Sequence, residues 1–143
     1  MMSVTDSFGP MLARAISKGS KVLEKAQAQN AAVVQSNIIK GIRSQKYVTN
    51  WPSLSEATKK RKRKLRLSPL TLVAHGDYSS SFETRKHDNT TYEVGTNRPD
   101  ARRHEFGFEA GGEPERPHVR PALKDSAEQI KENYVRAVSE IFE

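Results

Sequence analysis

The sequence predicts an α+β domain, in which a small antiparallel sheet of three or four strands packs with a long N-terminal helix and a C-terminal helix. Apolar residues recur every three or four positions over 11–46 and again over 121–141, whereas 70–106 carries strand formers and turn residues. Helices and antiparallel strands segregated along the chain are typical of this class. The length of 143 residues fits one compact unit, so we expect a single domain over 1–143.

The first helical pattern, over 11–46, predicts one long helix or two in series. We expect a flexible N-terminus over 1–9. Gly19-Ser20 and Asn30 are the positions where the helix could kink or divide. The apolar stripe is short and drifts, which favours an amphipathic helix packed on the core over a sustained coiled coil. The stripe consists of Leu12, Ile16, Gly19, Leu23, Ala26, Val33, Val34, Ile38 and Ile42.

A short helical segment rich in basic residues is predicted after Trp51. The proline that follows Trp51 keeps this tryptophan out of helical geometry. Ser53 and Glu56 have the spacing of a capping box, which indicates a helix start. Seven of the eight residues in 59–66 are basic, and we expect a basic loop over 59–68. The cations of this run are Lys59, Lys60, Arg61, Lys62, Arg63, Lys64 and Arg66.

The central part of the chain predicts antiparallel strands. Strand formers over 79–85 and 90–96 flank a turn at 87–89, which is a hairpin signal. Residues 101–106 could add a third strand. The glycines and prolines of 107–117 predict a loop.

The C-terminal segment predicts a helix that packs one face on the sheet or on a partner. Its apolar residues alternate at spacings of four and three, with charged and polar residues between them. Pro121 is acceptable in the first turn of such a helix. The apolar residues are Leu123, Ala127, Ile130, Tyr134, Ala137 and Ile141.

The overall composition limits the classes of function. Lysine and arginine number 24 against 17 acidic residues, and the net charge of +7 favours anionic partners. Without cysteine, neither a disulfide framework nor a thiolate metal site is available. The N-terminus lacks the order of a signal peptide, and no apolar run is long enough to span a membrane. We therefore expect a soluble, unprocessed protein that does not enter a membrane.

Five titratable residues are candidates for a catalytic or metal site, namely His75, Asp77, His87, His104 and Glu105. No His-Glu-x-x-His pattern is present, and His104 and Glu105 would point to opposite faces of the predicted strand. The sequence also has no nucleophile elbow and no phosphate-binding glycine loop. We therefore expect no enzymatic activity, no cofactor and no metal.

Four short motifs follow one another in the order typical of one family. Together they resemble the tail-completion (neck) proteins of long-tailed bacteriophages, also described as virion-morphogenesis or minor tail proteins. The resemblance spans residues 10–142. Asp77 and His118 depart from it, since an apolar residue and an aromatic residue are usual at these places. The motifs are Trp51-x-x-Leu54-Ser55-x-x-Thr58; Leu72-Val73-Ala74-His75-Gly76-Asp77-Tyr78 with Ser81; Ala101-Arg102-Arg103-His104-Glu105-Phe106-Gly107; and Arg116-Pro117-His118-Val119-Arg120-Pro121-Ala122-Leu123.

The resemblance gives the last two motifs a role in shaping the fold. Gly107 would supply a positive φ at a strand exit, and Phe106 would anchor this corner in the core. Pro117 and Pro121 would stiffen an extended segment before the terminal helix. The motif residues with this expected role are His104, Glu105, Phe106, Gly107, Arg116, Pro117 and Pro121.

The resemblance implies a structural virion protein that joins the head connector to the tail during assembly. Made in the cytoplasm of the bacterial host, it would take its place in the virion at the head–tail interface. Its copies would form a ring, with a hexamer as the expected state. Its partners would be head-closure or connector proteins on one side and tail-terminator or tail-tube proteins on the other.

The basic run has three readings. It could contact nucleic acid, which leads to the alternative function of a nucleic-acid-binding accessory protein using 59–66. It could instead face an acidic patch on a neighbouring ring protein, or remain a solvated loop. In a neck ring it could line the channel and make non-specific contact with genomic DNA. Trp51 is either a core anchor or an interface residue, because tryptophan is enriched in both.

Overall fold

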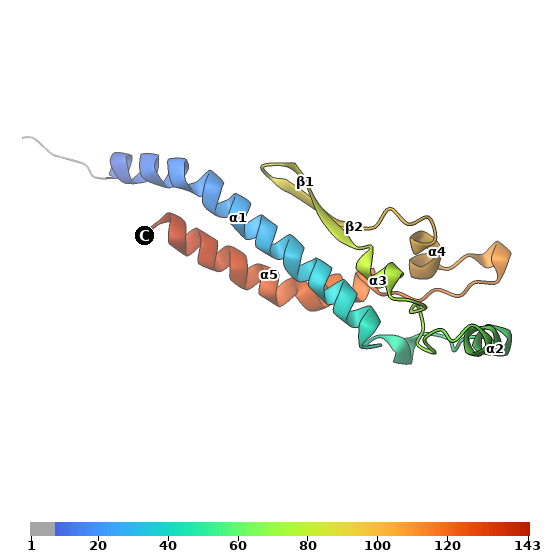
Figure 1. Cartoon of the computed structure of the whole chain (residues 1–143). Coiled ribbons are helices and arrows are strands. Elements are labelled where there is room, and N and C mark those ends of the chain that lie inside the picture. Colours follow the sequence, from blue (N-terminus) through green and yellow to red (C-terminus); the bar gives the residue numbers. More distant parts are fainter. Residues whose placement is uncertain (1–7) are drawn as a thin grey trace, which may run out of the picture.

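The computed structural model describes residues 8–143, and it confirms the α+β class. Two long antiparallel helices run side by side, and a hairpin packs on the first of them (Figure 1). The shorter helices gather at the end of the molecule far from the C-terminus (Figure 1). The elements are α1 (Phe8–Arg43), η1 (Val48–Asn50), α2 (Glu56–Lys64), α3 (Asp77–Ser80), β1 (Glu83–Asp88), β2 (Thr91–Gly95), α4 (Ala101–Phe106), η2 (Glu109–Gly111) and α5 (Val119–Ile141).

The N-terminal pattern forms one helix of 36 residues rather than two. Gly19 does not break α1; it is buried against α5, where Ile141 lies at ordinary van der Waals distance, 3.6 Å, from the position of an added Cβ. Asn30 does not break it either, since its side chain accepts a hydrogen bond from Asn133 of α5 at 2.8 Å. Helix α1 begins at Phe8, so the predicted flexible N-terminus is wrong at 8–9, and 1–7 lie outside the described residues.

Small and polar residues, rather than the largest apolar ones, form the contact between α1 and α5. Asn37 donates to Ser126 at 2.8 Å, and the Lys18 ammonium donates to the Glu140 carbonyl at 2.7 Å. Small side chains let two helices approach closely, and this contact turns several large side chains outward. The prediction that Ile16 faces the core is therefore wrong, because this residue is 70% exposed. Leu123, on the face predicted to pack on the sheet or on a partner, is 52% exposed. The buried residues of α5 are Ala122, Ser126, Asn133 and Ala137.

The main hydrophobic core lies where α1 ends, below the hairpin. Ile38 and Ile42 of α1 are completely buried there, and Ala122 of α5 closes the core from the other side. Burying such side chains is the main driving force of folding. The buried members of this core are Val34, Ile38, Ile42, Tyr47, Trp51, Tyr78, Phe82 and Ala122.

Within the described residues the sheet is a hairpin of two antiparallel strands, so the expected count of three or four is not reached. Strand β1 pairs with β2 in a register that sets Glu83 opposite Gly95. The predicted third strand over 101–106 is wrong, because these residues form helix α4. A glycine with φ of +74° ends that helix, as is common at helix C-termini. The strand predicted from 79 begins only at Glu83, since α3 covers the residues before it.

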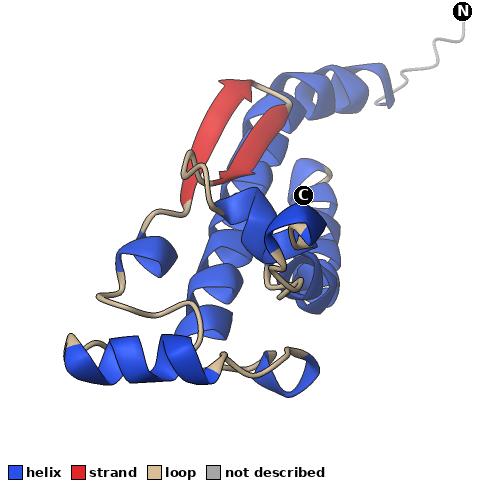
Figure 2. Cartoon of the chain, turned by 90° about the vertical axis from the view of Figure 1, so that its right-hand side faces the viewer, coloured by secondary structure: helices blue, strands red, loops and turns tan. Residues whose placement is uncertain are grey.

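The predicted basic loop over 59–68 is helical as far as Lys64. The Ser55 hydroxyl caps α2 by accepting the backbone N–H of Thr58 at 3.2 Å, so the capping box predicted from Ser53 is wrong by two residues. The described chain confirms the turn between the strands and a mostly irregular stretch over 107–117. Figure 2 shows α2 lying across one end of the molecule.

Replacing Gly41 by alanine should lower the free energy of unfolding by about 1–3 kcal/mol, since overpacking a core forces neighbours to shift. An added Cβ would lie 2.6 Å from Cε2 of Tyr47, whose buried ring is held by a 2.7 Å hydrogen bond to Asp125. Urea unfolding measures the change. Gly9→Ala is the matched control, because no atom of residues 8–143 lies within 4 Å of a Cβ added there. Equal stabilities of the two variants would contradict this packing.

Candidate functional site

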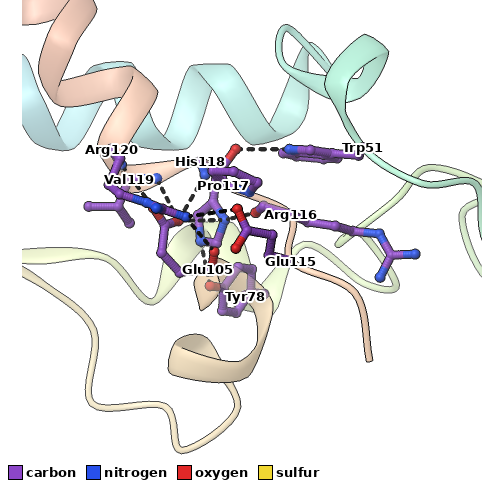
Figure 3. A network of polar contacts seen from close by, with 9 residues as sticks. All are labelled: Trp51, Tyr78, Glu105, Glu115, Arg116, Pro117, His118, Val119 and Arg120. Atoms are coloured by element: carbon purple, nitrogen blue, oxygen red, sulfur yellow. Dashed lines mark hydrogen bonds and ion pairs between the residues drawn. The ribbon is translucent and has the colours of Figure 1, made fainter. Parts of the chain in front are cut away.

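The two motifs that were expected to shape the fold meet at the start of α5, where Glu105 of α4 caps the helix (Figure 3). The buried Glu105 carboxylate accepts the backbone N–H groups of His118 at 2.8 Å, Val119 at 2.9 Å and Arg120 at 3.0 Å. It also accepts from the Arg120 guanidinium at 3.0 Å. The first N–H groups of a helix have no partner within the helix, and its N-terminus favours negative charge. One carboxylate therefore joins α4 to α5.

His118 lies completely buried beside this carboxylate. Its Nδ1 is 2.8 Å from the Arg116 carbonyl oxygen, which only accepts hydrogen bonds, so Nδ1 carries the proton. Nε2 of the neutral ring then accepts from the Tyr78 hydroxyl at 2.6 Å. Burial lowers the pKa of His118. Edge contacts of its ring with Trp51 and Phe82 complete its surroundings.

Trp51 belongs to the core. Its side chain is buried, and its indole N–H donates to the Pro117 carbonyl at 2.8 Å (Figure 3). Arg116 adds a second link, because its guanidinium donates to the Pro52 carbonyl at 3.2 Å. The segment before α2 is thereby tied to the segment before α5. Of the two readings of Trp51, the structure supports the core anchor, and it does not bring the indole together with the basic side chains.

Gly107 ends helix α4 rather than a strand, and a side chain would not fit at this position. Its φ is +74°, and an added Cβ would lie 2.9 Å from both the Glu113 oxygen and the Glu115 nitrogen. Phe106 is not a core anchor, and that prediction is wrong. Its ring is 56% exposed and lies 4.8 Å from the Arg120 guanidinium, because the helix directs it away from the buried Glu105.

The remaining members of the two motifs line the same junction. The His104 carbonyl accepts the backbone N–H of Arg116 at 2.7 Å, which holds the end of α4 beside the extended segment. Pro117 precedes α5, and Pro121 lies in its first turn, where a missing N–H costs little. The junction therefore uses backbone and side-chain groups of both motifs together.

The electrostatics of this junction suit a structural role. Burial alone would raise the pKa of Glu105, but the backbone hydrogen bonds and Arg120 outweigh it and hold the pKa below its usual value. The carboxylate is therefore ionised and has its partners in place. Across residues 8–143, no group of three or more possible ligands is placed to hold a metal ion. The arrangement fixes three segments of the chain relative to one another.

The basic run separates into an inward and an outward part. The Lys62 ammonium donates to the carbonyls of Leu70 at 2.5 Å and Val73 at 2.9 Å, so it holds the loop after α2. Burial lowers the pKa of Lys62. Lys59 forms an ion pair with Glu56 at 2.8 Å within the helix. The exposed cations are Lys60, Arg61, Arg63, Lys64 and Arg66.

The opposite end of the molecule carries apolar side chains that the described chain does not cover. They come from the first turns of α1 and the last turns of α5, and Ile16 and Val135 are 70% and 62% exposed. We call this group of exposed residues the apolar end. Sequence periodicity assigned two of them, Leu12 and Ile16, to the packed stripe of the first helix, and the helix packing shows that both are exposed. The apolar end consists of Met11, Leu12, Ile16, Val135, Val138 and Phe142.

Comparison of the chain with protein-family models, with curated proteins and with solved structures finds no match. The described helices include none that is both long and apolar enough to cross a membrane.

Glu105→Ala should lower the free energy of unfolding by about 2–4 kcal/mol, because it removes a helix cap and leaves three N–H groups at the start of α5 without their acceptor. Chemical denaturation measures the loss. Glu115→Ala is the control, since that carboxylate is 56% exposed and touches Arg120 only at 3.4 Å. Its expected cost is below about 0.5 kcal/mol. Equal losses for the two variants would argue against Glu105 as the cap.

Stability should fall as the pH drops from 7 to 5. The pKa values of His118 and His104 are lowered by burial in the folded state, so the unfolded chain binds protons more readily. That contribution is present above the ordinary histidine pKa of about 6.5 and is lost as the pH falls below it. Urea unfolding at several pH values measures the slope, which His118→Gln should reduce. An unchanged slope in this variant would refute the assignment to His118.

Proposed function

We propose that this chain is a structural protein of the neck of a tailed bacteriophage, where it joins the head connector to the tail. It acts as a ring subunit through protein–protein contacts, and it is located in the neck of the virion. The proposal rests on the ordered resemblance of four motifs to tail-completion proteins and on the two-ended shape of the molecule. Head-closure proteins, tail-terminator or tail-tube proteins and further copies of the chain are its proposed partners.

The observation that carries this proposal is the separation of two unlike groups of exposed side chains at opposite ends of the molecule (Figure 1). The apolar end lies at one extreme of the paired helices, and the basic helix α2 lies at the other (Figure 1). Large exposed apolar side chains mark protein interaction sites. A cluster of cations favours an acidic protein surface or nucleic acid. A joining protein must meet different neighbours on its two sides, and this distribution suits that task.

The junction around Glu105 supports the same proposal. It ties α5, which carries part of the apolar end, to the segment that leads into α2. Because Trp51 donates to the Pro117 carbonyl, the two ends are connected through packed and hydrogen-bonded groups rather than through a free linker. A rigid link between contact surfaces lowers the ordering cost of assembly.

A second candidate is a nucleic-acid-binding accessory protein. The outward cations of α2 favour it, since lysine and arginine clusters bind phosphates and release counterions. The same cations could face DNA in the channel of a neck ring, so contact with DNA alone does not separate the two candidates. Their difference lies in whether assembled particles require the protein.

Deletion of the gene from the phage or prophage that encodes it tests the neck role directly. The expected lysate contains DNA-filled heads beside separate tails, because the joining subunit is missing. Negative-stain electron microscopy distinguishes the products. Complementation with the wild-type gene should restore joined particles and serves as the control. Complete particles in the deletion lysate would reject the neck role.

Removal of the outward cations tests the contact with DNA. We expect weaker DNA binding and a smaller dependence of the affinity on salt, since each lost phosphate contact lowers the slope by about one. Fluorescence anisotropy at several salt concentrations measures both. The test variant replaces Lys60, Arg61, Arg63 and Lys64 by serine. The control variant, which loses the same charge, replaces Lys21, Lys25, Lys131 and Arg136 by serine. Wild-type DNA binding by the test variant would exclude α2 as the DNA-binding surface.

A further inference from the structure

A groove of about 400 Å³ separates the hairpin from the C-terminal helix, with α1 as its floor. Val34 belongs to the floor, Tyr92 and Val94 of β2 form one wall, and Leu123 and Tyr134 of α5 form the other. Every residue that lines the groove is uncharged, although the protein as a whole is strongly charged. Leu123 is 52% exposed, so the wall is accessible from solvent.

Two amide side chains of the groove, the buried Asn30 and the half-buried Gln27, each have one atom that is hydrogen-bonded and one buried atom that has no hydrogen-bond partner among the described residues. Asn30 is 7% exposed, and its Oδ1 accepts from Asn133 at 2.8 Å. The Gln27 amide donates to the Thr90 carbonyl at 2.8 Å. Within residues 8–143 neither Asn30 Nδ2 nor Gln27 Oε1 has a hydrogen-bond partner. Buried polar atoms are usually paired, so this donor and this acceptor point to a hydrogen-bonding ligand.

The wall formed by β2 is also the edge of a sheet. The hairpin of the described chain has two strands, so β1 occupies one side of β2 and the other side has no strand beside it. In Figure 2, β2 is the strand that lies nearer to the long helices. A free edge presents backbone N–H and C=O groups that pair readily with another chain.

We propose that this groove binds an extended, uncharged, apolar segment of another protein, which adds to β2 as a third strand. The segment would place alternate apolar side chains on Val34 and Leu123 and turn the others to solvent, as the period of a strand requires. Its backbone supplies both an acceptor for Asn30 Nδ2 and a donor for Gln27 Oε1. A charged segment would lose solvation in a neutral groove without gaining a partner. The inference does not depend on the neck role.

The test uses the purified chain and a blocked hexapeptide of alternating valine and threonine as the probe. We expect the backbone amides of 91–95 to shift in NMR spectra and to exchange more slowly as peptide is added. The side-chain amides of Asn30 and Gln27 should shift with them. The same peptide with lysine in place of the central valine should bind at least tenfold more weakly. A tenfold change in the dissociation constant corresponds to about 1.4 kcal/mol of binding free energy.

A matched pair of variants locates the site. Leu123→Lys places a charge in the groove wall, whereas Ser139→Lys places one at an exposed position of the same helix outside both the groove and the apolar end. The first should weaken peptide binding at least tenfold, and the second should leave it unchanged. Equal binding by both variants, or no response of 91–95 up to millimolar peptide, would overturn the proposal. If the NMR signals of the groove residues shifted with protein concentration in the absence of peptide, the proposal would also be overturned, because the groove would then bind a second copy of this chain.

Discussion

The helix cap made by Glu105 is the interaction on which the arrangement of this protein depends. Helix α5 begins in the interior, where N–H groups without partners would be costly, and one carboxylate from α4 satisfies three of them. The cap fixes the start of α5, and His118 then connects it to Tyr78. The Trp51 indole binds the carbonyl of the residue before His118, so the approach to α2 is held as well. Removing the carboxylate would affect every one of these links.

Much of the fold can be predicted from the sequence where one local rule decides the outcome. The long α1, the hairpin and α5 follow from periodicity and turn residues, and all three are present. Residues 101–106 form a helix, in agreement with the helix formers Ala101, Arg102, Arg103 and Glu105 and the glycine that follows; the strand prediction did not use these local signals. The predicted apolar stripe of α1 is buried at Gly19, Ala26, Val34, Ile38 and Ile42. It is displaced by one position only near the start of the helix, where α5 packs on Ala15 and Val22 and leaves Ile16 and Leu23 exposed.

The candidate site could be predicted only in part. The sequence identifies His104, Glu105, Arg116 and Pro117 as residues that shape the fold, and their meeting at one junction agrees with that interpretation. It does not separate Lys62 from the cations beside it, because its carbonyl partners come from a loop whose path the sequence leaves open. The apolar end and the groove beside β2 depend on how distant segments pack, so composition and spacing do not reveal them.

The apolar end and the basic helix α2 lie at opposite ends of the molecule, which gives a physical basis for a joining role. The proposal of a neck protein is decided by where the chain is located in a phage particle. Cryo-electron microscopy of particles from the phage or prophage that encodes this chain is the most direct measurement. The account predicts a ring of copies between the connector and the tail, with α2 and the apolar end facing different neighbours. A mature particle that lacks this chain, or that holds it away from the head–tail joint, would contradict it.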